Sequence, residues 1–146
     1  MHIESPLGFI ADFPEHTQVL EDSSAGPNTE QYGLLGDVLV TVIKDDTSVQ
    51  GAPQANGWAH LMSEFYLEER KGTLLTEGEL NIPGRSAYAV LVGYTDAEGT
   101  AMVAASVGVW ESGRFIGVLV MWPYANPEVE PRVDLLKEIV SSIRTA

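Results

Sequence analysis

The chain has 146 residues, no cysteine and a net charge of −13, from 21 acidic and 8 basic side chains. This length fits a single domain, residues 1–146, whose core needs no disulfide. The lack of cysteine excludes disulfides, thiolate catalysis and cysteine-bound zinc. The acidic excess argues against nucleic acids and anionic membranes as partners, because both bind basic surfaces, and it allows a basic protein partner.

The N-terminus, MHIESPLGF, lacks the basic and apolar regions of a signal peptide. The longest apolar run, residues 115–122, is far shorter than the roughly 20 residues of a membrane-spanning helix. We therefore expect a soluble, cytoplasmic chain without a lipobox, or an exported one if a leader has been removed.

The first third of the chain has the patterns of β-strands. Residues 9–13 alternate in hydrophobicity and are followed by Pro14, which cannot donate to a β-ladder. Residues 22–29 are turn formers and predict a loop. Residues 32–35 predict a short strand, and residues 38–43, with valine at alternate positions, predict a clearer one.

A long polar connection and then a helix are expected next. Residues 45–57 are polar and read as a loop. Asn56 is a plausible N-cap and Gly72 a plausible residue just past the C-terminus. Large apolar residues at helical spacing predict the buried stripe: Trp58, Leu61, Met62, Phe65 and Tyr66.

Four strands are predicted after this helix, at residues 73–82, 87–95, 101–110 and 115–122, and short turns between them indicate antiparallel pairing. The last two strands are apolar on both faces, so each face needs a covering layer.

The C-terminal segment returns to helical spacing, with a start near Pro131. Its apolar stripe is Val133, Leu136, Ile139, Val140 and Ile143. The expected fold class is therefore α+β, an antiparallel β-sheet with amphipathic helices on both faces.

Common catalytic motifs are missing from the sequence: it has no GxSxG, Walker loop, GxGxxG or HExxH. We therefore predict no catalytic residue and no cofactor, and we expect a protein that is not an enzyme.

One helix face offers metal-ligating side chains, because His60, Glu64 and Glu68 are spaced by four residues. They could share a cation, or they could form a solvated face. We favour the solvated face and predict no metal, and the same face could bind a partner.

Aromatic residues near strand ends are the second group of candidate binding residues: Trp110, Trp122 and Tyr124, together with Trp58 on the helix. They could pack in the core or form a recognition surface near Trp110 and Trp122.

The order of elements resembles the superfamily of the photosystem subunit PsbP and the yeast Ran-binding nuclear import factor, with bacterial DcrB-like and LpqN-like members. The residues that carry this resemblance are LGFIADFP (7–14), GDVLVTVI (36–43), WAHLMSEFYLEERKG (58–72), IPGRSAYAVLVGY (82–94) and LLKEIVSSIR (135–144). The resemblance implies an α/β/α sandwich and a non-enzymatic binding or accessory role. It carries over no functional residue.

Three functions stay open at this point. The first is a non-catalytic protein-interaction module, and the second is a small-molecule or lipid carrier with an apolar pocket between sheet and helix. The third is an enzyme or metal protein that uses His60, Glu64 and Glu68. An open strand edge could also pair two copies into a homodimer.

Overall fold

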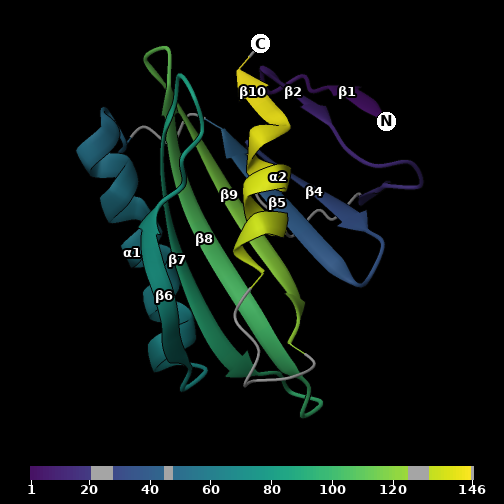
Figure 1. Cartoon of the computed structure of the whole chain (residues 1–146), viewed down its shortest axis with the longest axis vertical. Coiled ribbons are helices and arrows are strands. Elements are labelled where there is room, and N and C mark those ends of the chain that lie inside the picture. The colour runs from purple at the N-terminus through teal and green to yellow at the C-terminus, as the bar shows by residue number, and fades with distance from the viewer. Residues whose placement is uncertain (21–27, 45–47, 125–131, 146) are drawn as a thin grey trace.

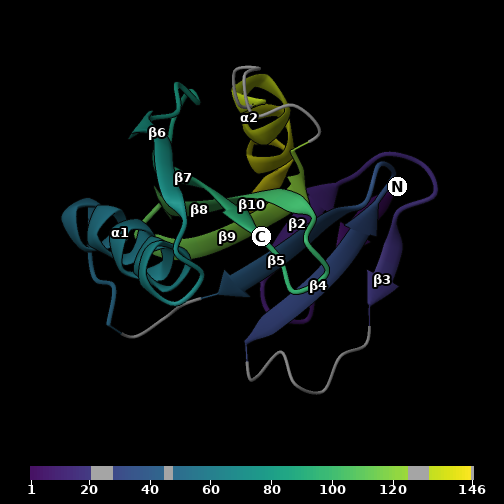
Figure 2. The same ribbon diagram turned by 90° about the horizontal axis from the view of Figure 1, so that it is seen from below.

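The fold is a strongly twisted antiparallel sheet with covering layers on both faces (Figures 1 and 2). The computed structural model describes residues 1–20, 28–44, 48–124 and 132–145. Helix α1 lies on one face of the large sheet, and helix α2 lies on the other (Figure 2). The predicted α+β class, with helices on both faces of an antiparallel sheet, is therefore confirmed.

The large sheet has seven strands, and every neighbouring pair is antiparallel. Its order is β3 (Gln18–Leu20), β4 (Thr29–Leu34), β5 (Val38–Lys44), β9 (Arg114–Pro123), β8 (Ala101–Glu111), β7 (Ser86–Thr95) and β6 (Thr73–Glu79). A small sheet contains β1 (His2–Glu4), β2 (Phe9–Asp12) and β10 (Ile143–Thr145), and the helices are α1 (Ala52–Glu68) and α2 (Val133–Ser141).

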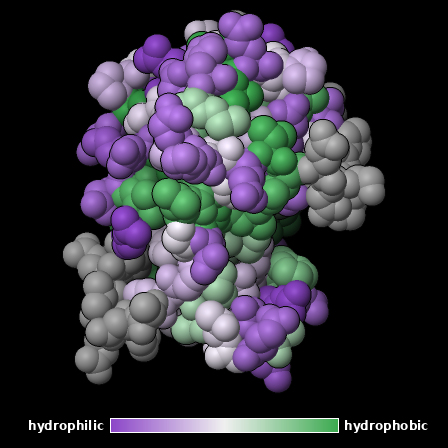
Figure 3. Space-filling model, turned by 90° about the vertical axis from the view of Figure 1, so that its right-hand side faces the viewer, coloured by the Kyte–Doolittle hydropathy of each residue, from purple (hydrophilic) through white to green (hydrophobic). Residues whose placement is uncertain are grey.

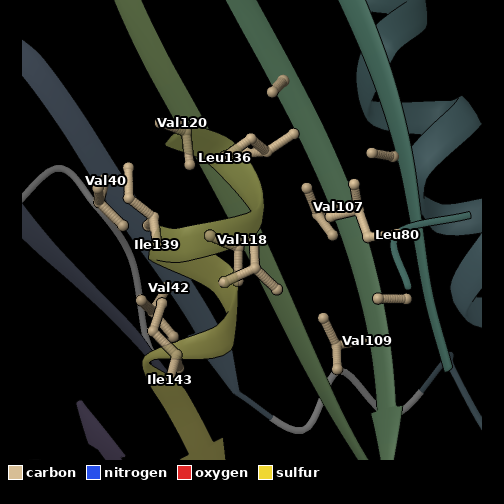
Figure 4. Packing of buried hydrophobic residues seen from close by; sticks show 14 of the residues in the cluster. Val40, Val42, Leu80, Val107, Val109, Val118, Val120, Leu136, Ile139 and Ile143 are labelled. Atoms are coloured by element: carbon tan, nitrogen blue, oxygen red, sulfur yellow. The ribbon is translucent and has the colours of Figure 1, made fainter. Parts of the chain in front are cut away.

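Alternate residues of the central strands form the larger core, on the α2 side of the sheet. Val42, Val118 and Val107 are register partners across β5, β9 and β8 and therefore share this face. The labelled side chains of Figure 4 come together here from the large sheet, from α2, from β10 and from the segment after β6: Val40, Val42, Val107, Val109, Val118, Val120, Leu136, Ile139, Ile143 and Leu80. The predicted alternation of valines in 38–43 is thus confirmed.

On the other face, small residues of β8 and β9 allow α1 to approach closely. A Cβ added to Gly108 would lie 2.0 Å from the carbonyl oxygen of Ala55, and one added to Gly117 would lie 2.6 Å from the Trp58 ring. The helix thus packs almost directly on strand backbone. Both faces of β8 and β9 are covered, as their hydrophobicity predicts.

Helix α1 begins earlier than the sequence suggests. It starts at Ala52 with Pro53 in its first turn, so the predicted loop over 45–57 is wrong from residue 52 onward, and Asn56 lies inside the helix. Residues 45–47 lie outside the described residues. The polar composition of 52–57 hid the first turns, because Ala55 alone in this stretch is buried.

The predicted buried stripe of α1 is only partly correct. Its buried residues are Ala55, Trp58, Ala59 and Ser63, whereas Leu61 and Phe65 are 58% and 48% exposed. Small side chains face the sheet because the helix lies so close to it. A pattern of large apolar residues does not reveal such a contact.

The C-terminal stripe also divides between two elements. Val133, Leu136, Ile139 and Val140 belong to α2, but Ile143 starts β10, which pairs with β2. The predicted helix start at Pro131 lies outside the described residues. Strands β1, β3 and β10 were not predicted, because three-residue strands carry almost no periodic signal.

Arg85, in the turn before β7, connects α2 to the sheet. Its guanidinium donates to the carbonyl oxygens of Val140, Ser141 and Ile143, at 3.2, 2.9 and 2.5 Å. Its Nε lies 3.6 Å from a carboxylate oxygen of Glu111. Burial lowers the pKa of Arg85, and the charge of Glu111 opposes that effect. Carbonyl oxygens at the end of α2 and at the start of β10 therefore accept hydrogen bonds from a side chain that lies far earlier in the chain.

Candidate functional site

The predicted aromatic residues do not form one surface. Trp110 is the register partner of Phe115, next to the β8–β9 turn, whereas Trp122 pairs with Val103 at the other end of the two strands. Trp110 packs on the α1 side and Trp122 belongs to the α2-side core. The expected recognition surface near both tryptophans is therefore not assembled, because consecutive antiparallel strands place their last residues at opposite ends.

Two of the tryptophans are core residues. Trp58 and Trp122 are 5% and 3% exposed. Trp58 meets Phe115 edge-on, with ring centroids 5.2 Å apart. Tyr124 is half-buried against the α2-side core, and its backbone N–H donates to the carbonyl oxygen of Ala101 at 2.8 Å. Of these three residues, Tyr124 has the most accessible side chain.

His60 contacts residues of β6 and β7 at the edge of the large sheet. Its Nε2 lies 3.2 Å from a carboxylate oxygen of Glu77 on β6, and its ring lies 5.4 Å from that of Tyr88. The Tyr88 hydroxyl donates to the same Glu77 oxygen at 3.1 Å. Within the described ranges, no group of three or more His, Cys, Asp or Glu side chains is placed to hold a metal ion.

Glu64 and Glu68 are exposed and lie beside a hydrophobic strip whose residues are predicted by their spacing to be buried. This helix strip consists of Leu61 and Phe65. Phe65 meets Tyr66 edge-on at 5.2 Å, and the Tyr66 hydroxyl reaches the Met121 sulfur at 3.5 Å. Through Tyr66 and Met121, the helix strip therefore adjoins the face of the large sheet on which α1 lies.

That face of the sheet is only partly covered, because α1 packs mainly on β7 and β8. Next to it, β5 and β9 present side chains that are partly buried: Leu39, Ile43, Leu119 and Met121. Exposed hydrophobic side chains also occur near the β3 edge, at Val19, Leu20 and Leu35. Figure 3 shows that hydrophobic residues form a band across the side of the molecule that carries this edge.

A hollow of about 560 Å³ lies where α1 ends and β6, β7 and β8 meet. Arg70 and Lys71 line it from the α1–β6 connection, and Thr95 and Tyr124 line it from the sheet side. The hollow is open to solvent, and one of the predicted binding residues, Tyr124, lines it. Sequence reasoning missed it because its walls come from four separate segments.

Arg70 connects the hollow to the helix strip. Its guanidinium lies 5.5 Å from the centroid of the Phe65 ring, a cation–π contact. Burial raises the pKa of the Tyr66 and Tyr94 phenols, whose rings are 5.1 Å apart, and the positive charge of Arg70 partly opposes that rise. Both phenols stay neutral at physiological pH, so they provide hydrogen-bonding groups and not a base.

Proteins of similar fold are found among solved structures. No protein-family model matches the chain, and no curated protein sequence is significantly similar. Among solved structures, cyanobacterial PsbP (CyanoP) from Synechocystis sp. PCC 6803 is similar with a TM-score of 0.64 and 10% identity, over 100% of this chain and 92% of that one.

Two further structures are similar. A protein from Bacteroides thetaiotaomicron has a TM-score of 0.60 and 11% identity over 99% of this chain, which spans 48% of that protein. LpqN, a Mycobacterium tuberculosis protein involved in cell envelope biogenesis, has a TM-score of 0.49 and 14% identity over 100% of this chain and 90% of its own. The predicted PsbP-like resemblance is confirmed at the level of the fold.

Neither α1 nor α2, the helices in the described ranges, is long and apolar enough to cross a membrane.

Proposed function

We propose that this chain is a non-catalytic protein-interaction module that binds a basic, partly apolar segment of a partner protein on the exposed face of α1. The observation that carries the proposal is the helix strip, in which Leu61 and Phe65 are exposed next to the acidic side chains Glu64 and Glu68. Of the predicted binding residues, Glu64 and Glu68 contribute to this surface directly.

The strip has the composition of a binding surface. An aromatic ring and a leucine one helical turn apart provide anchor side chains, and burying each removes apolar area from water. The partly buried Leu119 and Met121 extend the surface beyond the helix. The helix packs closely on the sheet, because Ala55 lies against Gly108 of β8 and Trp58 lies against Gly117 of β9.

Charge favours a basic partner. The chain carries 21 acidic and 8 basic side chains, so its field attracts cations. Glu64 and Glu68 place negative charge beside Leu61 and Phe65, and Arg70, 5.5 Å from the Phe65 ring centroid, offsets part of it. Such rim charges mainly accelerate association and select partners, whereas the apolar anchors determine how long the complex lasts.

The test compares capture from source-cell lysate by the wild type, by Leu61→Gln/Phe65→Gln and by Leu35→Gln. A partner bound through the strip is retained by the wild type and by Leu35→Gln, which removes an exposed leucine near the β3 edge, and it is lost from the double variant. Titration of the purified partner should show a loss of about 2 kcal/mol or more in binding free energy, as expected for anchor residues.

Glu64→Gln/Glu68→Gln tests the charge of the partner. Binding of a basic segment weakens in this variant at low salt, and the difference from wild type disappears as salt screens exposed charges. Retention of the same proteins by the wild type and the Leu61/Phe65 variant would contradict the proposal, as would capture of no protein by either. Unchanged melting of all variants is the control for folding.

A further inference from the structure

Arg70 and Lys71 are adjacent bases in a strongly acidic chain, and both line the hollow at the end of α1. We propose that this hollow binds a small organic anion, with its carboxylate or phosphate at Arg70 and Lys71 and its apolar part against Leu75 and Met102. This site goes beyond the protein-binding role of the helix strip, and nothing in that role requires it.

The backbone holds the two bases at the rim of the hollow. The Gly72 N–H donates to the carbonyl oxygen of Tyr66 at 2.8 Å. A Cβ at Gly72 would lie 2.7 Å from the carbonyl oxygen of Gly93 and 2.8 Å from that of Tyr66. The connection is thus pressed against β7, and no side chain other than hydrogen fits at residue 72.

Lys71 has a strained backbone as a result. Its φ is +54°, a left-handed conformation that side chains other than glycine rarely adopt. The expected glycine at the helix end does not take this role, because Gly72 is required for the close approach to β7. Backbone strain of this kind persists only where the surroundings enforce it, and it is frequent at ligand sites.

The charged residues that line the hollow are both basic. Its lining contains two bases and no acidic residue. The nearest acidic group on the β7–β8 turn is Asp96, whose Oδ1 already accepts hydrogen bonds from the backbone N–H groups of Glu98 and Thr100, at 3.0 and 2.8 Å. Asp96 is held within its own turn, and its negative charge still acts on the lining residue Tyr94, whose pKa it helps to raise, so it offsets part of the charge of the two bases.

The remaining lining defines the ligand class. Thr73 and Thr95 supply hydroxyl groups, and Leu75, Ala101 and Met102 supply apolar surface. A volume of about 560 Å³ lies within the range of small-molecule sites, which combine apolar walls with a few convergent polar groups. Guanidinium and ammonium groups such as those of Arg70 and Lys71 recognise carboxylate or phosphate oxygens.

The experiment is an NMR titration of the ¹⁵N-labelled full chain with phenyl phosphate, benzoate and the neutral benzyl alcohol. We expect saturable shifts at residues 70–73 and 93–95 with at least one of the two anions, and no saturable shift there with benzyl alcohol. Arg70→Gln/Lys71→Gln should weaken anion binding by about tenfold or more, the usual loss for charge-assisted hydrogen bonds.

Two further variants separate local recognition from overall charge. Arg132→Gln/Lys137→Gln removes two bases near and on α2 and should change affinity by less than about twofold, because distant exposed charges are screened. Lys71→Gln alone should weaken binding while leaving the Arg70–Phe65 contact in place.

Three results would overturn the proposal: shifts scattered over the surface, equal affinity of wild type and Arg70→Gln/Lys71→Gln, or equal binding of benzyl alcohol. Partner capture by the Leu61/Phe65 variant is a separate measurement. If the hollow binds no anion, the proposal for the helix strip still stands. If the strip captures no partner, the proposal for the hollow still stands.

Discussion

Gly108 determines how closely α1 can approach the sheet, because its missing side chain leaves room for the backbone of Ala55. The space has no flexible neighbour that could move aside, since the nearest atoms to an added Cβ are backbone atoms of the helix. The identity of this one residue therefore fixes the position of a 17-residue element.

Gly108→Ala should lower the free energy of unfolding by about 1–3 kcal/mol, the usual cost of overpacking a well-packed contact. The matched control is Gly57→Ala, on the exposed side of α1, where an added Cβ meets nothing within 4 Å. That change should raise stability by about 0.5–1 kcal/mol through helix propensity. Urea denaturation of both variants measures the difference, and equal effects would contradict this account of the packing.

Elements are joined here by single side chains as well as by strand pairing. Helix α2 ends against Arg85, whose side chain is 5% exposed and which donates to three carbonyl oxygens at the junction of α2 and β10. This contact ties the last two elements of the chain to the start of β7.

Arg85→Met should destabilise the protein by about 2–4 kcal/mol, because it removes three hydrogen bonds and leaves the partly buried Glu111 without its cation. Arg85→Met/Glu111→Met should recover part of this loss, since neither charge is then left unpaired. Lys137→Met, at an exposed position of α2, should stay within about 0.5 kcal/mol of wild type. Hydrogen exchange would localise the effect, and unchanged protection of residues 139–145 in Arg85→Met would refute the capping role.

At the scale of the whole molecule, the excess of negative charge opposes the compact state. Net self-repulsion is relieved by salt, since the Debye length falls from about 30 Å at 0.01 M to about 8 Å at 0.15 M ionic strength. We expect the melting temperature to rise by about 2–5 °C over this range, which corresponds to roughly 1 kcal/mol for a chain of this size.

Calorimetry at the two ionic strengths measures this effect. Glu15→Gln/Glu98→Gln removes two exposed charges and should reduce the salt response. A melting temperature that falls with added salt would show that attractive ion pairs dominate over repulsion, and an undiminished rise in this variant would show that these two charges do not contribute to the repulsion.

Local spacing of residue types predicts the central strands of this chain, but not which face of α1 is buried. Alternating valines at 38–43 predicted a two-faced strand, and the hydrophobicity of 101–110 and 115–122 predicted layers on both sides, because these signals depend on local spacing. Leu61 and Phe65 were placed in the core, since large apolar residues usually mark the buried face. They are exposed because the residues that face the sheet at this close distance are Ala55, against Gly108, and Trp58, against Gly117.

The α+β class, the antiparallel order of the second half and the excess of acidic residues follow from residue types and their near neighbours, so the amino-acid pattern predicts them. The separation of Trp110 and Trp122, the contact of His60 with Glu77 and the hollow that Arg70 and Lys71 line with Tyr124 follow from the packing of the folded chain. Each of these arrangements depends on residues that are far apart in the chain. Their relative positions depend on how closely helix and strand backbones approach one another, and the spacing of residue types along the chain carries no information about that distance.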